Sequence, residues 1–352
     1  MKLAGIAACV PKNTVSTTEA YKNFKQFDVD RIIGNTGVKE KREGGPDMTT
    51  MDMSITAARA LLEKLDWDPN TVDAVIYSGV TPDQIMPSCS YRAQHELGLG
   101  ERCLVFDVNL GCSGFTHAMI VLNGLIASGV VKRALLMCGD MSTDTFRPSV
   151  TNVEHREDLA NAILFGDSGV VTAVSSDADE VRSTFFGADG SGLDQIMVPG
   201  GGAKNYWKPE LFERVADPDT EGESRRPLDL QLRGPQILTF TMKRVPPMLN
   251  ELLDKAGWER DQVDVYALHQ ANQFMLKFLA RKAKMAAEKI PFSIEKFGNT
   301  SSASIPLTML TSCQDKLRVP TKWVMMGFGV GLSWSGLTME TSDIVTLPLI
   351  ET

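Results

Sequence analysis

The feature that most constrains the fold is a repeat between two distant segments of the chain. Residues 61–77, LLEKLDWDPNTVDAVIY, align without a gap to residues 252–268, LLDKAGWERDQVDVYAL. Trp258 follows Trp67 by 191 residues, and a Val-Asp pair after each tryptophan keeps the same separation. Agreement over so long a register indicates that one supersecondary plan occurs twice. We therefore expect two halves related by a pseudo-twofold axis and joined near residue 180.

Each half alternates between strand-like and helix-like segments. Apolar runs typical of buried strands, such as VDAVIYSGV and RALLMCGD, are separated by helical stretches such as MDMSITAARALLEKLD. This alternation predicts a layered α/β fold, with halves at residues 1–180 and 181–352. Between about 187 and 235 the chain is rich in glycine, proline and charge. That stretch is expected to form loops or an excursion over the surface.

Composition excludes several classes of protein. The formal charge of -8 argues against a broad nucleic-acid or anionic-membrane surface, because both need a cationic face. No apolar run approaches the roughly 20 residues of a membrane helix, and the first apolar run ends at Pro11, too early for a secretory signal. The six cysteines show no paired spacing. We expect a soluble, cytoplasmic protein without a structural zinc site.

Cys112 is a candidate nucleophile because of where it lies. The segment VNLGCSGFTHAM places it between glycines, just before an apolar helix expected to be central. A helix N-terminus offers free N–H groups and the positive end of the dipole, which lower the pKa of a thiol. The alternative is that Cys112 is a small buried hydrophobe. His117 lies about 140° further round the helix and is expected to be a core residue.

Two later segments supply possible partners. His269 follows an apolar strand in YALHQANQ, and Asn299 precedes a second central helix in FGNTSSASIPL. The 191-residue offset matches this helix to the one after Cys112. Each residue alone is weak, because core histidines and asparagine caps are common. Strand ends and helix starts are where α/β folds collect active residues, so together they indicate one site.

The motifs GCSGF, HQAN, FGNTSSASIP, FGDSG and GFGVGLSW resemble those of the β-ketoacyl-acyl-carrier-protein synthase III group of the thiolase superfamily. The resemblance covers nearly the whole chain. It implies a thiolase-like, five-layered αβαβα fold, a homodimer, and a catalytic triad of Cys112, His269 and Asn299. Thiolases carry a second cysteine in the C-terminal glycine loop, and this chain has none there. The resemblance therefore favours a ketosynthase over a thiolase.

The implied reaction explains these residue types. An acyl group moves from coenzyme A or from the phosphopantetheine of an acyl carrier protein to Cys112. The N–H groups of Cys112 and of the loop near Val330 stabilise the oxyanion. A malonyl-type thioester then loses carbon dioxide, and His269 Nε2 and the Asn299 amide donate to the enolate. The carbanion attacks the acyl-cysteine, with no resident cofactor or metal.

The chain departs from the family pattern at the expected coenzyme A mouth. A tryptophan and an arginine of the family are replaced by Arg31 and Asn35, a second arginine by Leu159, and a basic residue after HQAN by Phe274. Phosphate recognition relies on fixed cationic groups, so four changes argue against ordinary acyl-CoA priming. Acyl-CoA stays a possible donor.

Further positions suggest substrate and partner contacts. Met86 occupies the place of a family residue that crosses the dimer interface to close the partner's acyl pocket, with ordinary packing as the alternative. Lys277, Arg281 and Lys284 share one predicted helix face, which suits an acidic carrier protein or is simply solvated. Asp167 and the glycines at 200–202 are interpreted as turn and loop structure. His95 and His155 are expected at the surface.

Other functions fit less well. A papain-like protease also has Cys, His and Asn in that order, but its local cysteine motif differs. The GFGVG segment lacks the βαβ context of a dinucleotide loop. A silent partner subunit is expected to lose triad residues, and all three are kept. The main alternative is a family member of specialised metabolism that joins two acyl chains or acylates an oxygen or nitrogen nucleophile.

Overall fold

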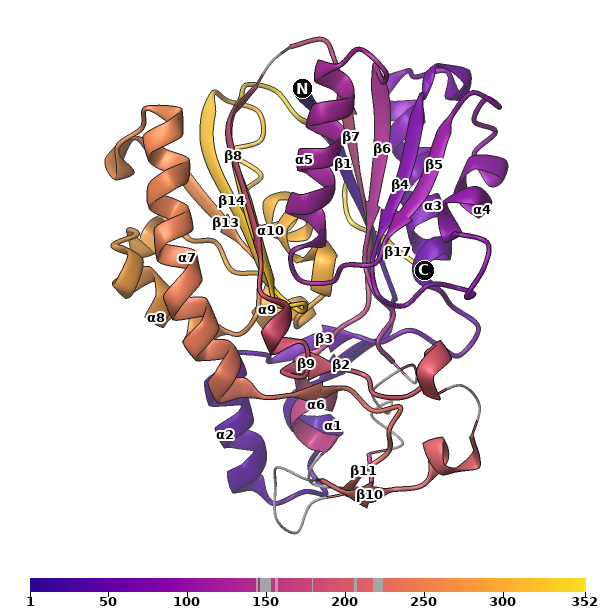
Figure 1. Cartoon of the computed structure of the whole chain (residues 1–352), viewed down its shortest axis with the longest axis vertical. Coiled ribbons are helices and arrows are strands. Elements are labelled where there is room, and N and C mark those ends of the chain that lie inside the picture. Colours follow the sequence, from indigo (N-terminus) through magenta and orange to yellow (C-terminus); the bar gives the residue numbers. More distant parts are fainter. Residues whose placement is uncertain (144, 146–152, 156–157, 179, 206–207, 218–223) are drawn as a thin grey trace.

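The computed structural model describes residues 1–143, 145, 153–155, 158–178, 180–205, 208–217 and 224–352. Two β-sheets form its frame (Figure 1). The first has the order β16-β1-β7-β6-β4-β5, with β17 also on β1. Its strands are β1 (Lys2–Val10), β4 (Ala74–Ser78), β5 (Leu104–Val108), β6 (Arg133–Cys138), β7 (Gly169–Ser175), β16 (Val345–Thr346) and β17 (Ile350–Glu351).

The second sheet repeats the plan of the first. It has the order β13-β14-β15-β8, built from β13 (Val265–Leu268), β14 (Thr321–Gly329), β15 (Ser333–Thr341) and β8 (Val181–Ala188). The β13/β14 pair is parallel and the next two pairs are antiparallel, as in the β4-β6-β7-β1 part of the first sheet. The change of sheet falls between β7 and β8, although β16 and β17 return to the first sheet.

Helices complete five layers (Figure 1). An outer layer of α3 (Thr50–Leu65) and α4 (Cys89–Glu96) covers the first sheet, and α5 (Gly114–Ala127) and α10 (Ser304–Ser312) lie between the sheets. The other outer layer is α7 (Gly234–Ala256) and α8 (Gln273–Ala283). Three large apolar clusters fill the interfaces where helices meet sheets: one between each sheet and its outer helices, and one that packs α5 and α10 between the two sheets. The αβαβα prediction is confirmed.

Local sequence explains the main helices. A capping box closes the start of α3, where Thr49 accepts from the Asp52 N–H and Asp52 accepts from the Thr49 N–H. α10 is buried from Ser304 to Leu310, as its apolar sequence predicts. α5 differs, because Val121 is 43% exposed on one side. Its apolar surface is therefore not all covered within one chain.

A smaller region lies beneath the five layers (Figure 1). It contains α1 (Thr17–Ala20), α2 (Gln26–Thr36), α6 (Leu159–Leu164) and the strand pairs β2/β3 (Thr14–Ser16, Glu40–Arg42), β9/β12 (Ile196–Met197, Gln231–Leu232) and β10/β11 (Val215–Ala216, Ser224–Arg225).

Short helices connect the main elements in several parts of the described chain. Single-turn helices occur at 69–71, 190–192, 203–205, 209–212, 260–262, 287–289 and 301–303, and α9 spans Ile294–Phe297. The described part of 187–235 thus consists mainly of loops and two-residue strands.

Candidate active site

One cavity brings the three predicted catalytic side chains together. It measures about 720 Å³, and Cys112, His269 and Asn299 all contribute to its wall. Cys112 lies two residues before α5, His269 directly follows β13, and Asn299 follows α9. Much of the remaining wall is aliphatic, including Leu164, Ile196, Val198, Leu228, Leu230 and Ile237. Such a wall suits an aliphatic chain with polar chemistry confined to one end.

The Cys112 thiol is protonated at neutral pH in the resting protein. Burial raises the pKa of Cys112 to about 11, and backbone N–H groups of Val330 and Cys112 itself oppose this effect. The expectation of a lowered thiol pKa is therefore wrong, because desolvation outweighs the helix N-terminus. The same two N–H groups are those predicted to form the oxyanion hole.

The glycine loop after β14 approaches Cys112 closely. Gly329 has φ +154°, and a Cβ there would lie 2.7 Å from the Cys112 Cβ and 2.8 Å from its Sγ. A Cβ on Gly327 would lie 2.7 Å from the Cα of Ser113. Only glycine leaves room for this approach, which brings the Val330 N–H to the thiol.

His269 is a buried, neutral imidazole. Its Nδ1 lies 2.8 Å from Ser304 Oγ, and its ring meets Phe328 edge-on at 5.8 Å between centroids. Burial lowers the pKa of His269 to about 4, against a backbone interaction with Ser301 that raises it. The imidazole is therefore uncharged at neutral pH, and Nε2 is the nitrogen left for a ligand.

The Asn299 amide has a defined orientation. Its Oδ1 accepts from the Ser301 N–H at 2.9 Å, which distinguishes the oxygen from the nitrogen. Among the residues that the structure describes, Nδ2 makes one long contact, of 3.5 Å, to the Ala271 carbonyl. The Asn299 side chain is 4% exposed, so its amide hydrogens can serve a substrate oxygen in the cavity.

Comparison with known proteins decides the family. Residues 106–190 match the family described as 3-oxoacyl-[acyl-carrier-protein] synthase III, and residues 253–341 match its C-terminal part. The crystal structure of a 3-oxoacyl-(acyl-carrier protein) synthase from Burkholderia xenovorans is 35% identical in sequence and has a TM-score of 0.90. That similarity covers 100% of this chain and 97% of the other. The chain belongs to the 3-oxoacyl-[acyl-carrier-protein] synthase III family.

Other synthase III relatives are similar over the same span. The β-ketoacyl-[acyl-carrier-protein] synthase III of Alkalilimnicola ehrlichii is 28% identical over 335 residues, which is 95% of this chain and 97% of that one. A synthase III structure from Pseudomonas aeruginosa is 25% identical with a TM-score of 0.81, covering 98% of this chain and 99% of the other. The protein described here is accordingly an acyl-transferring condensing enzyme, as a member of this family.

The positions predicted to alter the coenzyme A mouth do not line the main cavity. Arg31 and Asn35 are exposed on α2, and Phe274 is 51% exposed at the start of α8. α2 and α8 are in contact, and Gly34 and Phe274 line a second groove of about 500 Å³. Leu159, the fourth of these positions, is fully buried in an apolar cluster with residues of α2.

The basic residues predicted to dock a carrier protein are exposed at the outer surface. Lys277 and Arg281 lie on α8, and Arg281 stacks over the ring of Phe278. Lys284 caps α8 with φ 55°, so it does not continue the helical face. These residues lie outside the main cavity, beside the second groove.

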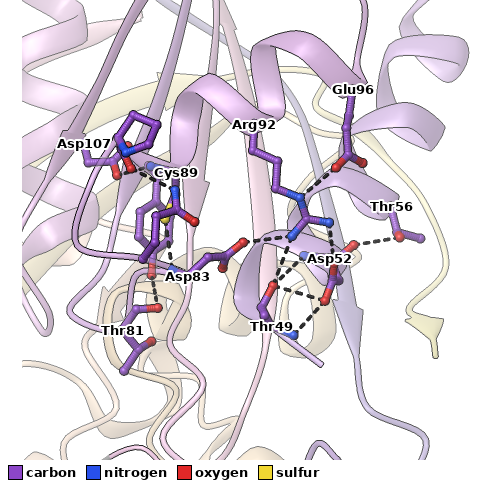
Figure 2. Close-up of polar contacts among 12 residues, drawn as sticks. Thr49, Asp52, Thr56, Thr81, Asp83, Cys89, Arg92, Glu96 and Asp107 are labelled. Atoms are coloured by element: carbon purple, nitrogen blue, oxygen red, sulfur yellow. Dashed lines mark hydrogen bonds and ion pairs between the residues drawn. The ribbon is translucent and has the colours of Figure 1, made fainter. Parts of the chain in front are cut away.

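Met86 is 81% exposed and does not line the main cavity of its own chain. The segment that carries it is anchored at both ends (Figure 2). Asp83 pairs with Arg92 at 2.8 Å, and Asp107 accepts from the N–H groups of Cys89 and Ser90. The Met86 side chain therefore projects outward from a segment that these contacts fix in place.

Three histidines and Asp167, which the sequence places outside the reaction site, can also be located in the structure. His95 and His155 are exposed, and His117 is half-buried against Ser335, away from the cavity. Asp167 is buried and accepts from the N–H groups of Ser142 and Gly44, as a turn residue would. Among the described residues, no cluster could hold a metal, no disulfide forms, and no helix could cross a bilayer.

Two contributions to the cavity were missed in the sequence. The glycines at 200–202 were interpreted as loop structure alone, yet all three belong to the cavity wall. Asp140 directly follows Gly139 at the end of β6 and lines the same cavity. Its position after an apolar strand was the available signal, the same one that identified His269.

Proposed function

We propose that this enzyme condenses an acyl group held on Cys112 with the carbanion of a malonyl-type thioester. The observation that carries the proposal is the cavity that unites Cys112, His269 and Asn299 with the backbone of Val330. The incoming thioester oxygen would lie between the Cys112 and Val330 N–H groups as negative charge develops on it. The acyl chain would extend along the aliphatic wall.

In the second half-reaction, a malonyl-type thioester enters the acylated site. Loss of carbon dioxide leaves an electron pair that forms an enolate, whose oxygen accepts from His269 Nε2–H and the Asn299 amide. Neutral donors suit this step, and the buried His269 supplies one without a competing positive charge. The enolate carbon attacks the acyl carbonyl, and Cys112 leaves as a thiolate. The thioesters bring all the groups transferred, so we propose no resident cofactor.

The partners we propose are an acyl carrier protein and a second copy of the chain, in the cytoplasm. Lys277 and Arg281 supply exposed positive charge on an otherwise acidic protein, which suits an acidic carrier. For the dimer, β5 lies at the edge of the first sheet, and Ile85 and Met86 are 78% and 81% exposed on the segment that Asp107 of β5 anchors through the Cys89 N–H. Exposed apolar side chains at a sheet edge favour coverage by another chain.

Intact-mass spectrometry tests the reaction. Purified protein is incubated with acyl-CoA and acyl-carrier-protein donors, and the wild type is compared with Cys112→Ala. We expect an acyl adduct on the wild type that is absent from the variant, and a β-ketoacyl product once a malonyl thioester is added. No adduct from any donor would contradict the proposal.

A second candidate function is kept because of the altered α2 and α8 surface. Arg31, Asn35 and Phe274 replace the residues expected to hold coenzyme A, which favours carrier-protein donors and a specialised acyl transfer. Adducts formed only from carrier-protein donors would support this candidate. Efficient acylation by acyl-CoA would favour ordinary chain initiation.

A further inference from the structure

A three-residue loop joins β14 to β15 at the catalytic cavity. The two strands pair up to the residues on either side of it, so the loop consists of residues 330–332. Its end at Leu332 is held by the backbone. The Leu332 carbonyl accepts from the Asp189 N–H at 2.8 Å, and the Leu332 N–H donates to the Asp189 carbonyl at 3.2 Å. The other end of the loop, Val330, lines the cavity.

Two serine hydroxyls in series hold the Val330 end. The Ser333 hydroxyl donates to the Val330 carbonyl at 2.6 Å, and the Ser113 Oγ lies 2.7 Å from the Ser333 Oγ. A serine hydroxyl has a single hydrogen to donate. Because Ser333 gives its hydrogen to Val330, Ser113 is the donor to Ser333. The hydrogen bonds therefore run in one direction, from Ser113 through Ser333 to Val330.

These hydroxyls lie in the interior, where the first turn of α5 meets β15. Ser113 and Ser333 are 0% and 5% exposed, and Ser113 directly follows Cys112 in the chain. A buried hydroxyl costs free energy unless it is hydrogen-bonded, and in a low dielectric each such bond is strong. The series of bonds thus ties the segment that carries the nucleophile to the loop.

Glycines leave the room that this arrangement needs. Gly331 has φ +134°, and a Cβ there would lie 3.2 Å from the Ser333 Cβ and 3.3 Å from its Oγ. A Cβ on Gly327 would come within 2.7 Å of the Ser113 Cα. A side chain at either glycine would therefore crowd one of the two serines.

We propose that Ser113 and Ser333 are positioning residues that hold the loop backbone from Gly329 to Val330 against the sulfur of Cys112. The inference rests on the proposed condensing function, in which negative charge develops on the thioester oxygen beside this backbone. In the part of the chain that the structure describes, neither serine belongs to the cavity wall, so both act through the loop. Loss of their bonds should slow acyl transfer more than a reaction of the same thiol that forms no oxyanion.

Two rates measured on each variant test this inference. The first is formation of acyl-Cys112 from an acyl thioester, followed by intact mass. The second is alkylation of Cys112 by iodoacetamide, followed by peptide mapping. Alkylation displaces iodide and forms no oxyanion, so it reports only the access and reactivity of the thiol. We expect Ser333→Ala to acylate on the order of 10- to 100-fold more slowly than the wild type and to be alkylated within about threefold of it.

Ser113→Ala tests the order of the series. It leaves the bond from Ser333 to Val330 in place, so the acylation rate should fall by only about three- to tenfold. Adding Ser113→Ala to Ser333→Ala should cause no further loss, because Ser113 acts through the hydroxyl that is already absent. Losses that multiply in the double variant would overturn the proposed series.

Ser335→Ala is the matched control. Ser335 lies two residues further along β15 on the same face, is fully buried, and contacts Thr116 and, at 2.7 Å, His117 Nδ1 of α5. Its removal disturbs the same contact between α5 and β15 at a distance from the loop, so both rates should stay within about threefold of the wild type.

The inference is overturned if Ser333→Ala acylates at the wild-type rate, or if Ser335→Ala loses as much acylation as Ser333→Ala. If Ser333→Ala does not fold, Ser113→Ala is compared with Ser335→Ala. A loss of acylation confined to Ser113→Ala then supports the inference, and equal rates overturn it. A wild type that is alkylated at Cys112 but forms no acyl-Cys112 would instead overturn the proposed function.

Discussion

At the scale of single residues, the site combines a protonated thiol with a neutral imidazole. Burial accounts for both states, since desolvation disfavours the thiolate of Cys112 and the imidazolium of His269. An apolar cavity that admits an acyl chain therefore imposes the resting protonation of the groups in it. We infer that the thiol loses its proton as it attacks the thioester and that this proton ends on the thiol of the departing donor.

The first prediction concerns the reactivity of Cys112 as a function of pH. Its pKa of about 11 means that the thiolate fraction rises with pH throughout the neutral range. Alkylation of Cys112 by iodoacetamide should accelerate about tenfold per pH unit between about pH 7 and 9, because the thiolate is the nucleophile. Peptide mapping measures the rate at this residue, with Cys112→Ala as the blank. A plateau near neutral pH would contradict the raised pKa.

The second prediction concerns the glycine loop. Gly329→Ala places a methyl group within 2.8 Å of the thiol sulfur, so the loop or Cys112 must move. Acylation should fall by at least about 100-fold, as a displacement near 1 Å at a reacting group allows. Gly34→Ala in α2 is the control, because its Cβ would meet nothing within 4 Å. Equal acylation by both variants would contradict the packing argument.

At the scale of elements, Arg92 joins three parts of the first half (Figure 2). From α4 it contacts Asp52 of α3 at 2.6 Å, Asp83 of the Met86 segment at 2.8 Å and Glu96 at 2.7 Å. The guanidinium is planar and forked, so it can serve three carboxylates at once. This cluster fixes the place from which Met86 projects.

The third prediction follows from that cluster. The Arg92 side chain is 34% exposed, so solvent screens part of its charge, and we expect Arg92→Ala to lower the free energy of unfolding by about 1–2 kcal/mol. Burial raises the pKa of Asp52, but its hydrogen bonds, first with Arg92, lower it overall. A lowered pKa gives stability that is present above the unfolded value near 4 and lost as the pH falls through the folded value.

Urea unfolding of the wild type and Arg92→Ala at several pH values provides the measurement. The difference between the two proteins should shrink as the pH falls below about 4. Arg59→Ala is a suitable control, because Arg59 is 59% exposed and pairs with Glu96 at 3.8 Å. A difference that does not change with pH would show that Arg92 acts through packing alone.

At the scale of the whole molecule, the two halves share one order of strands, but their sheets end in different elements. The first sheet ends at β5, whereas the matching residues of the second half form α9 and lead into Asn299. One copy of the repeat thus ends in a strand edge and the other in the loop that carries Asn299. Within the described residues β5 pairs with β4 alone, and its other edge suits the second copy of the chain that we propose.

The fourth prediction tests that edge. Leu104 begins β5 and is 40% exposed, so Leu104→Arg places a charge where the partner strand would lie. We expect light scattering after size-exclusion chromatography to give two chains for the wild type and one for the variant. Val319→Arg, 44% exposed and remote from β5 in sequence, should keep the wild-type mass. A wild type of one chain would contradict the dimer.

The sequence by itself determined the fold class and the three residues that share the cavity. A repeat register and hydrophobic periodicity are local properties, so they predict two α/β halves without coordinates. Cys112, His269 and Asn299 were identifiable because each lies at a strand end or helix start, beside a motif that resembles a known family. A strand end or a helix start can be recognised from the order of residues along the chain, so these three residues could be identified without any interatomic distance.

Only the tertiary structure decided protonation, burial and support. The pKa of Cys112 was predicted in the wrong direction, since desolvation depends on which distant segments cover the thiol. Leu159 is buried among residues distant in the sequence, and the close approach of Gly329 to Cys112 joins residues 217 positions apart in the chain. Solvent exclusion and long-range hydrogen bonds arise only when the two halves meet, and no local pattern records them.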